Sequence, residues 1–154
     1  VRRARQVYAT PMPTEPVDVA ICNAYPKDTE FVQSGNALNI LASAARHRPV
    51  IKEGGSLVII TASPEGRGYH GIYGPGMRYD PLREEESWRG RRLTRYGATL
   101  VYFSPNLTSA DARHDAVFQA WSDLIRYLHR LHGSRASVAV FPCGSMQIAE
   151  ASNA

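Results

Sequence analysis

Four runs of this chain are almost continuously hydrophobic over the length of a β-strand. They cover residues 17–23, 56–62, 98–104 and 137–142 and are rich in valine and isoleucine. Such runs are typical of strands buried on both faces, as in a parallel sheet between two layers of helices. A weaker run, QVYATP at 6–11, predicts one more short strand.

A helix is predicted between the first two runs, over 29–46. Asp28 or Thr29 is suited to cap its start, and Pro49 ends it. Its apolar face consists of Phe31, Gly35, Leu38, Leu41, Ala42 and Ala45, and opposite lie Thr29, Gln33, Asn36, Ser43 and His47. Ile40 falls among the polar side chains.

A second helix is predicted over 109–132. Thr108 and Asp111 have the spacing that resembles a capping box at its start, and Gly133 is suited to end it. Its apolar stripe comprises Val117, Trp121, Leu124, Leu128 and Leu131.

Strand, helix and strand thus follow one another twice, which predicts an α/β fold. We expect a single domain over 1–154, with a mostly parallel sheet of four to five strands and helices on both faces, a Rossmann-like three-layer arrangement. The carboxyl ends of parallel strands meet at one edge of the sheet, where open α/β sheets bind ligands. The long segment 63–96 is rich in glycine, proline and arginine and begins at this edge, and loops of this length are usually functional.

The composition agrees with a globular protein and excludes several classes. With 154 residues, of which 44% are hydrophobic and 21% charged, the chain is long enough for one core of its own. No apolar run approaches the roughly 20 residues of a membrane span, and the start does not read as a signal peptide. Cys22 and Cys143 are isolated, which indicates a reducing compartment. We therefore expect a cytoplasmic protein with no membrane partner.

The basic residues are unevenly distributed. The net charge is +4, and 16 of the 18 basic residues are arginine. They concentrate in 83–95, where Glu84, Glu85 and Glu86 offset part of the charge. A solvated surface segment is the better interpretation of this stretch, and we expect no nucleic-acid partner.

Two glycine-containing motifs are similar to nucleotide or cofactor sites. Residues 66–71 spell GxGxxG, but IYGPG at 72–76 cannot continue the helix that a dinucleotide site needs, so a glycine-rich lid or docking loop is favoured. IKEGGSLVII at 51–60 resembles a turn and strand of class I methyltransferases. These enzymes also need a glycine-rich loop after their first strand, where this chain has AYPKD at 24–28. A methyltransferase fragment remains an alternative.

No self-contained metal site or nucleophile is predicted. His129 and His132 lie near the end of the second helix, where positive side chains interact favourably with the helix dipole. The chain has no HxxxH or HExxH motif, and Ser145 lacks the GxSxG elbow. We therefore predict no catalytic residue and no metal ligand here. His70 is of interest because it lies in the long loop at the binding edge.

The candidate binding residues lie in the turn after the first strand and on the helix that follows. Gln33 and Asn36 are three residues apart and hence neighbours on the face away from the core. Tyr25 and Lys27 precede them in the turn. Together they offer amide, ammonium and phenol donors to a small carboxylate or another anion. An ordinary capped helix start with a solvated lysine is the alternative.

Two longer stretches carry a resemblance to a known family. The first is VYATPMPTEPVDVAICNAYPKDTEFVQSGNAL at 7–38, and the second is VIKEGGSLVIITASPEGRG at 50–68. In this order they resemble the C-terminal domain of the nickel-pincer lactate racemase family, with its short strand, apolar strand, Gly-Tyr-Pro-x-Asp turn and glutamine-bearing helix. The resemblance covers residues 5–76 and becomes vague afterwards.

This resemblance implies an enzyme of two lobes. The N-terminal lobe of that family carries a nickel-pincer nucleotide on a lysine, and its histidines bind the metal and shuttle protons. The C-terminal lobe closes the cleft over a 2-hydroxyacid, which is racemised or epimerised by hydride transfer to the cofactor and back. This chain starts at Val1 without a methionine. We expect it to be the C-terminal lobe of a longer protein, inactive alone, with the cofactor held by the N-terminal lobe.

The resemblance also assigns substrate-binding residues. Gln33 matches the substrate-contacting glutamine, and the full candidate set is Tyr25, Lys27, Asp28, Gln33, Asn36, Glu65 and His70. Asn36 and Val32 stand where the family usually has lysine and tyrosine. An asparagine cannot supply the cation that pairs with a lactate carboxylate, so a larger, polyhydroxylated acid is an alternative substrate. Outside the family, a non-catalytic module that binds or docks small anions is the alternative.

Overall fold

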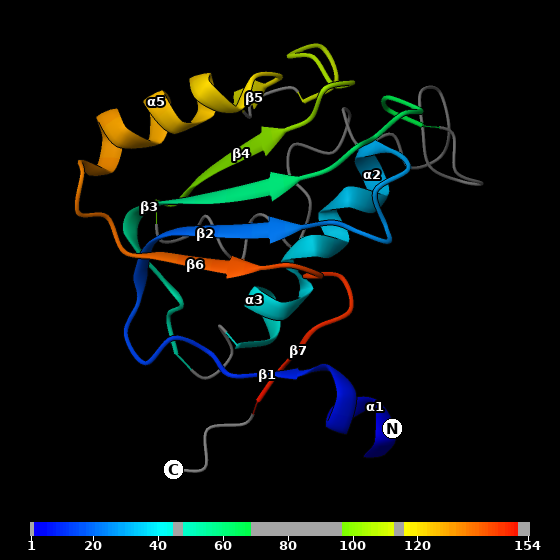
Figure 1. Cartoon of the computed structure of the whole chain (residues 1–154), viewed down its shortest axis with the longest axis vertical. Helices are drawn as coiled ribbons and strands as arrows, with labels where there is room; N and C mark the ends of the chain where they lie inside the picture. Colours follow the sequence, from blue (N-terminus) through cyan, green and yellow to red (C-terminus); the bar gives the residue numbers. More distant parts are fainter. Residues whose placement is uncertain (1, 45–47, 69–96, 113–115, 151–154) are drawn as a thin grey trace.

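The computed structural model contains a five-stranded sheet in which every strand runs parallel to its neighbours (Figure 1). It describes residues 2–44, 48–68, 97–112 and 116–150. The strand order is β5-β4-β3-β2-β6, from top to bottom in Figure 1. The strands are β2 (Val17–Asn23), β3 (Ile51–Ile60), β4 (Thr99–Phe103), β5 (Ala116–Phe118) and β6 (Val138–Phe141). The predicted α/β fold with a mostly parallel sheet is confirmed.

Helices pack on both faces of this sheet. They are α2 (Phe31–Ser34), the 3-10 helix η1 (Gly35–Leu38) and α3 (Asn39–Ala44) on one face, and α5 (Trp121–His132) on the other. Side chains of β2 alternate between the two cores, because Ala20 and Cys22 join the first. Val19 and Ile21 join the second. Among the described residues, no helix is long and apolar enough to cross a lipid bilayer.

The first predicted helix is not one continuous helix over 29–46. It begins at Phe31, and Glu30, rather than Asp28 or Thr29, accepts the N–H groups at its start. It then tightens into η1, where Gly35 and Asn36 are weak α-helix formers. A 3-10 turn has about three residues, which changes the face on which later side chains fall. This explains why Ile40, predicted among the polar side chains, is completely buried.

The second predicted helix begins at Trp121 and not at 109. Residues 116–118 form β5, which pairs with β4 and extends the sheet by one strand. Val117, predicted in the helical stripe, is therefore a strand residue. The Asp111 carboxylate does accept hydrogen bonds from the backbone and hydroxyl of Thr108, at 2.7 and 2.8 Å, but this turn is not followed by a helix at 109.

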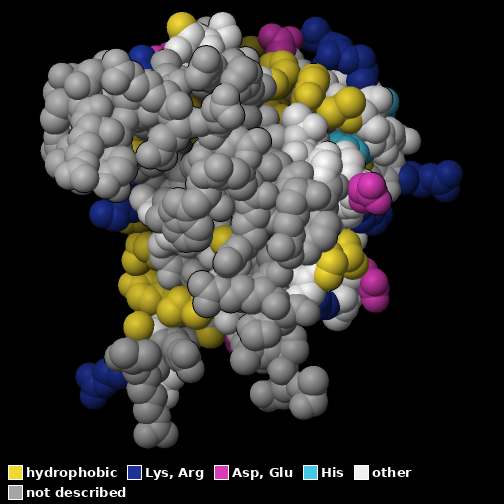
Figure 2. Space-filling model, turned by 180° about the vertical axis from the view of Figure 1, so that it is seen from behind, with side chains coloured by type: hydrophobic (Ala, Val, Ile, Leu, Met, Phe, Trp, Pro, Cys, Tyr) yellow, Lys and Arg dark blue, Asp and Glu magenta, His cyan; other side chains and the backbone are white. Residues whose placement is uncertain are grey.

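The short strand predicted over 6–11 is confined to two residues. Helix α1 (Arg2–Tyr8) leads into β1 (Ala9–Thr10), which pairs in parallel with β7 (Ile148–Ala149). Hydrophobic side chains gather at the end of the molecule where α1 lies, as the rear view in Figure 2 shows. The guanidinium of Arg48 donates to the carbonyl oxygens of Pro13 and Thr14 and so ties the connector after β1 to the end of the helical layer.

A polar network joins the three neighbouring strands at the amino edge of the sheet. Asp18 of β2 accepts hydrogen bonds from the hydroxyl and backbone N–H of Ser137, at 2.6 and 2.8 Å. The ammonium of Lys52 on β3 lies 2.9 Å from both oxygens of the same carboxylate. The Ser137 hydroxyl and then Lys52 hold the pKa of Asp18 well below its usual range.

Asp18→Asn is expected to lower the free energy of unfolding by about 1 kcal/mol at neutral pH, because charge-assisted hydrogen bonds are lost. The folded-state pKa of Asp18 is depressed. Its stabilisation is therefore fully present above the unfolded pKa of about 3.9, and it is lost as the pH falls through the folded-state pKa. Urea unfolding of both proteins near pH 7 and near pH 3 should show a smaller difference at the lower pH.

Glu53→Gln is the matched control, since Glu53 is an exposed carboxylate on β3 for which the described residues give no ion pair. It should leave the free energy of unfolding nearly unchanged. Equal losses in both variants, or a loss for Asp18→Asn that does not shrink at low pH, would show that the network does not stabilise the sheet.

Candidate functional site

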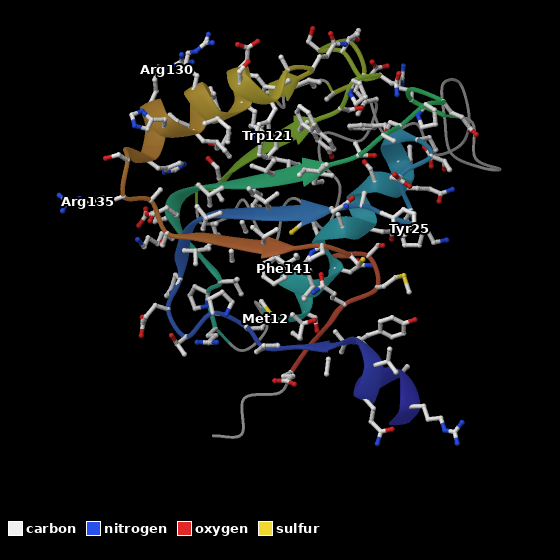
Figure 3. All side chains as sticks on the ribbon, viewed as in Figure 1. Met12, Tyr25, Trp121, Arg130, Arg135 and Phe141 are labelled. Carbon is white, nitrogen blue, oxygen red and sulfur yellow. The ribbon has the colours of Figure 1, made fainter. Side chains whose placement is uncertain are left out.

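The segments that follow β2, β3, β4 and β6 meet at the carboxyl edge of the sheet, as expected for parallel strands. The turn after β2 leads directly into α2, and Tyr25 projects beside this helix (Figure 3). The hydroxyl of Ser145, from the turn after β6, donates to the carbonyl oxygen of Tyr25 at 3.0 Å. Segments from the two neighbouring strands therefore contact one another at this edge.

The start of α2 is fixed by a buried carboxylate. Glu30 is 2% exposed, and its two oxygens accept the backbone N–H groups of Val32 and Gln33 at 2.8 and 2.9 Å. These bonds satisfy donors that a helix start otherwise leaves open. Sequence reasoning missed this residue, since a capping glutamate differs little from a solvated one unless the surrounding loop is known.

The surrounding loop is formed by residues 61–68, which follow β3. Three backbone hydrogen bonds join this loop to the start of α2 and the residues before it: Ser63 N–H to Asp28 O at 2.7 Å, Glu65 N–H to Thr29 O at 3.1 Å, and Phe31 N–H to Gly66 O at 2.9 Å. Gly68, at φ +73°, passes so close to Glu30 that a Cβ atom would overlap that side chain. Gly68 of the GxGxxG stretch thus serves close packing, whereas a Cβ atom at Gly66 would meet nothing within 4 Å and its φ of +59° is what favours glycine there.

Buried hydroxyl groups support the same loop from beneath. Thr61, Ser63 and Ser104 are almost completely buried, and the hydroxyls of Thr61 and Ser63 are 2.9 Å apart. The carbonyl oxygen of Ala62 accepts from the Ser104 hydroxyl at 3.1 Å and from the Asn106 amide at 2.8 Å. The segment after β4 therefore holds the 61–68 loop. No sequence motif indicates this group, because its members come from two strand ends.

The side-chain amides of Gln33 and Asn36 differ in their hydrogen bonds. Both residues are partly exposed. The Asn36 amide donates to the backbone carbonyl of Gln33 at 2.8 Å and so is partly engaged within its own helix. Within the described part of the chain, the Gln33 amide has no hydrogen-bond partner. Gln33 is therefore the side chain of the predicted pair that is available to a ligand.

The other predicted site residues take separate places along the edge. Tyr25 is 59% exposed, and Lys27 and Glu65 are also exposed. Asp28 is partly exposed, and the backbone bonds to the 61–68 loop bring it near Glu65. His70 lies outside the described residues, as do most of the 63–96 segment and the arginine-rich stretch at 83–95.

The thiol and imidazole groups form no reactive cluster in the described residues. Burial raises the pKa of the Cys22 thiol, and that side chain lies in the core. His132 lies 2.8 Å (Nε2 to Oγ) from Ser56, which pairs with Thr99 at the start of β4 and so lies away from the carboxyl edge. No group of three His, Cys, Asp or Glu side chains in the described ranges is arranged to hold a metal ion.

A hollow of about 450 Å³ opens at the other end of the carboxyl edge, between the segment after β4 and the start of α5. Its lining is Leu107, Thr108, Ser109, Val117, Phe118, Gln119, Ala120 and Asp123. None of the predicted site residues that the structure describes lines it. In the strand order, β3 lies between β4, which leads to the hollow, and β2, which leads to α2. Phe31 of α2 nevertheless packs on Tyr102 of β4, with ring centroids 5.0 Å apart.

Comparisons with known proteins relate the chain to one enzyme through its fold. No protein-family model matches the sequence, and no curated protein matches it. Among solved structures, the lactate racemase apoprotein from Thermoanaerobacterium thermosaccharolyticum matches with a TM-score of 0.66 and 16% sequence identity. The match covers 97% of this chain and 39% of that chain, so this chain spans about two fifths of the length of that structure. The described chain therefore has a lactate racemase-like fold.

Gly144→Ala is expected to lower the free energy of unfolding by about 1–3 kcal/mol through overpacking. Gly144 donates its N–H to the carbonyl oxygen of Asn23 at 2.9 Å, and a Cβ atom there would overlap the backbone carbonyl of Ala37 in η1. Backbone on both sides prevents an easy rearrangement. Urea unfolding monitored by circular dichroism measures the change.

Gly35→Ala is the control, because a Cβ atom at Gly35 would meet nothing within 4 Å and its φ of −57° is helical. This variant should be neutral or stabilising by up to about 1 kcal/mol. If Gly144→Ala left the free energy of unfolding unchanged, the turn after β6 would not be packed closely against η1.

Proposed function

We propose that this chain is the substrate-closing lobe of a lactate racemase-like enzyme that racemises or epimerises a 2-hydroxyacid. The position of Gln33 carries the proposal: its partly exposed amide lies at the carboxyl edge, unpaired among the described residues, on a helix start that Glu30 holds in place. Gln33 is also the residue that the sequence resemblance matches to a substrate contact. The lactate racemase-like fold supports the same family.

The described residues do not fit the nickel-pincer nucleotide that the resemblance implies. They offer no cluster able to hold a metal ion. The chain has two lysines, and Lys52 is paired with Asp18 at the amino edge. The proposal therefore assigns the cofactor to an N-terminal lobe of the same protein. The contribution of this lobe is to bind and orient the substrate.

The side chains at the carboxyl edge determine which substrate groups this lobe can bind. The Gln33 amide is able to donate to a carboxylate or to accept from a hydroxyl group. Lys27 supplies an exposed positive charge in the preceding turn. Asn36 donates to the backbone carbonyl of Gln33 and thereby favours one geometry of this helical turn. A neutral Asn36 favours a hydroxyl-rich acid over lactate, because hydroxyl groups pair with amides without needing a cation.

One observation favours the rival function, a non-catalytic module that binds small anions. The side chain at position 36 is neutral and partly engaged, so the helix face lacks the charge that the racemase family places there. The two functions differ in turnover. A binding module would hold a 2-hydroxyacid without interconverting its stereoisomers, even in the full-length protein.

Gln33→Ala in the full-length gene product should reduce kcat/KM for the native 2-hydroxyacid about twofold to thirteenfold, since one directed hydrogen bond is worth about 0.5–1.5 kcal/mol. Circular dichroism spectra and thermal unfolding should stay close to those of the parent protein. Ser43→Ala is the matched control, because Ser43 is exposed near the end of α3. Racemisation followed by chiral chromatography is the readout, and equal rates in both variants would remove Gln33 from the site.

Asn36→Lys tests the substrate class at the same site. If the site accepts small carboxylates, the introduced cation should raise kcat/KM for lactate relative to polyhydroxylated acids. If the site is built for a hydroxyl-rich acid, the same change should lower activity on that acid. Chiral chromatography with both substrates measures the ratio. An unchanged ratio would show that position 36 does not face the substrate.

A further inference from the structure

The face of the sheet that carries α5 is only partly covered. Five strands at about 4.8 Å spacing span about 19 Å, whereas one helix with its side chains is about 10 Å wide. Helix α5 lies toward β4 and β5, where Trp121 packs edge-on against Phe103 with ring centroids 5.2 Å apart. Tyr127 packs on Phe118 of β5 with centroids 5.0 Å apart. No second helix covers the β6 side of this face within the described residues.

The uncovered side forms an apolar groove between α5 and β6. Its volume is about 280 Å³, and its lining includes Val19 and Ile21 of β2, Ile125, Leu128 and His129 of α5, and Val138 of β6. Its rim is unusually apolar for a surface, with Val138 51%, Val140 61% and Ile125 44% exposed. Among the described strands, β6 has one neighbour, β2, and so forms an edge of the sheet. The groove therefore has the shape and chemistry that receive an amphipathic helix.

The charges around this groove are positive. Arg135 extends into solvent from the turn before β6, and Arg130 projects from the outer side of α5 (Figure 3). The nearby carboxylates are already paired: Asp123 lies 3.2 Å from Arg126, and Asp18 belongs to the network at the amino edge. A second copy of this chain would bring the same positive charges. An acidic partner is favoured instead.

We propose that the α5–β6 groove docks an acidic amphipathic helix of a partner protein. The apolar side of that helix lies on Ile125, Val138 and Val140, and its glutamates or aspartates lie near Arg135. β6 has four residues and is about 13 Å long, which matches about nine residues of helix. The groove lies on a face of the sheet and not at the carboxyl edge, so this inference does not depend on the proposed enzymatic function.

Two labelled synthetic peptides of about 14 residues test the proposal, a length that gives about four helical turns. Both contain the same leucine, alanine and glutamate residues. In one the leucines fall on a single helical face flanked by glutamates, and in the other the order is scrambled. Fluorescence anisotropy should show saturable binding of the first peptide only. The binding should weaken as salt is added, because charge pairs at the rim are exposed.

Val138→Thr with Val140→Thr keeps β-branched side chains in the strand and removes the apolar rim. The double variant should bind the amphipathic peptide about tenfold more weakly, which corresponds to about 1.4 kcal/mol. Val7→Thr is the matched control, since Val7 is an exposed valine on α1, and it should change nothing. Arg135→Glu should also weaken binding, with a smaller effect at high salt. If the double variant does not fold, Arg135→Glu alone decides the outcome.

Several results would overturn the proposal. Equal binding of the scrambled peptide, or equal losses for Val7→Thr and the double variant, would show that the groove selects no helix. Concentration-dependent dimerisation that the double variant abolishes would assign the groove to a second copy. Binding to vesicles of phosphatidylserine and phosphatidylcholine, lost in the double variant and without peptide binding, would assign it to a membrane surface.

Discussion

Burial of β2 on both faces is the constraint on which the rest of the structure depends. Its backbone groups are shielded from water and must pair with β3 on one side and β6 on the other. Both neighbours are parallel to it, and parallel strands cannot be joined by a tight turn. The connections must cross a face of the sheet, which is why α2–α3 and α5 form separate layers. The same constraint brings the turn after β2 and the 61–68 loop to one edge.

The carboxyl edge depends in turn on Glu30. A buried carboxylate is unfavourable unless hydrogen bonds replace its water, and the N–H groups of Val32 and Gln33 provide them. Gly68 lets the 61–68 loop close over this carboxylate, because it has no side chain. The orientation of Gln33 is therefore set by a loop that follows another strand. Ligand binding at Gln33 would therefore depend on β3 and β4, through this loop, as well as on the helix that carries Gln33.

Sequence analysis predicted the elements that depend on local hydrophobic periodicity. It missed the features that depend on contacts between residues distant in the sequence. β2, β3 and β4 were recognised because burial on both faces leaves a continuous hydrophobic run. β6 has the same hydrophobic pattern, although Val138 and Val140 are exposed on one of its faces. The three residues of β5 are too short for such a signal, and they become a strand by pairing with β4. This is why the helix start was predicted at 109. The interruption of the first helix and the role of Glu30 were missed for a related reason, since both depend on residues beyond the helix. Of the candidate site, Gln33 and the turn before it were predicted from sequence, whereas Ser104 and Asn106 were not.

The position of β6 has a consequence for the order of folding. β6 completes the sheet on β2, and the network between Asp18 and Ser137 closes a sequence separation of 119 residues. Contacts across such separations form late and slow the folding of a domain. During synthesis β2 emerges well before β6, and one of its edges stays unpaired until β6 has left the ribosome. An exposed, hydrophobic strand edge is prone to aggregation. Protection of the nascent chain by chaperones should therefore affect the yield of this protein more than that of a helical protein of equal length.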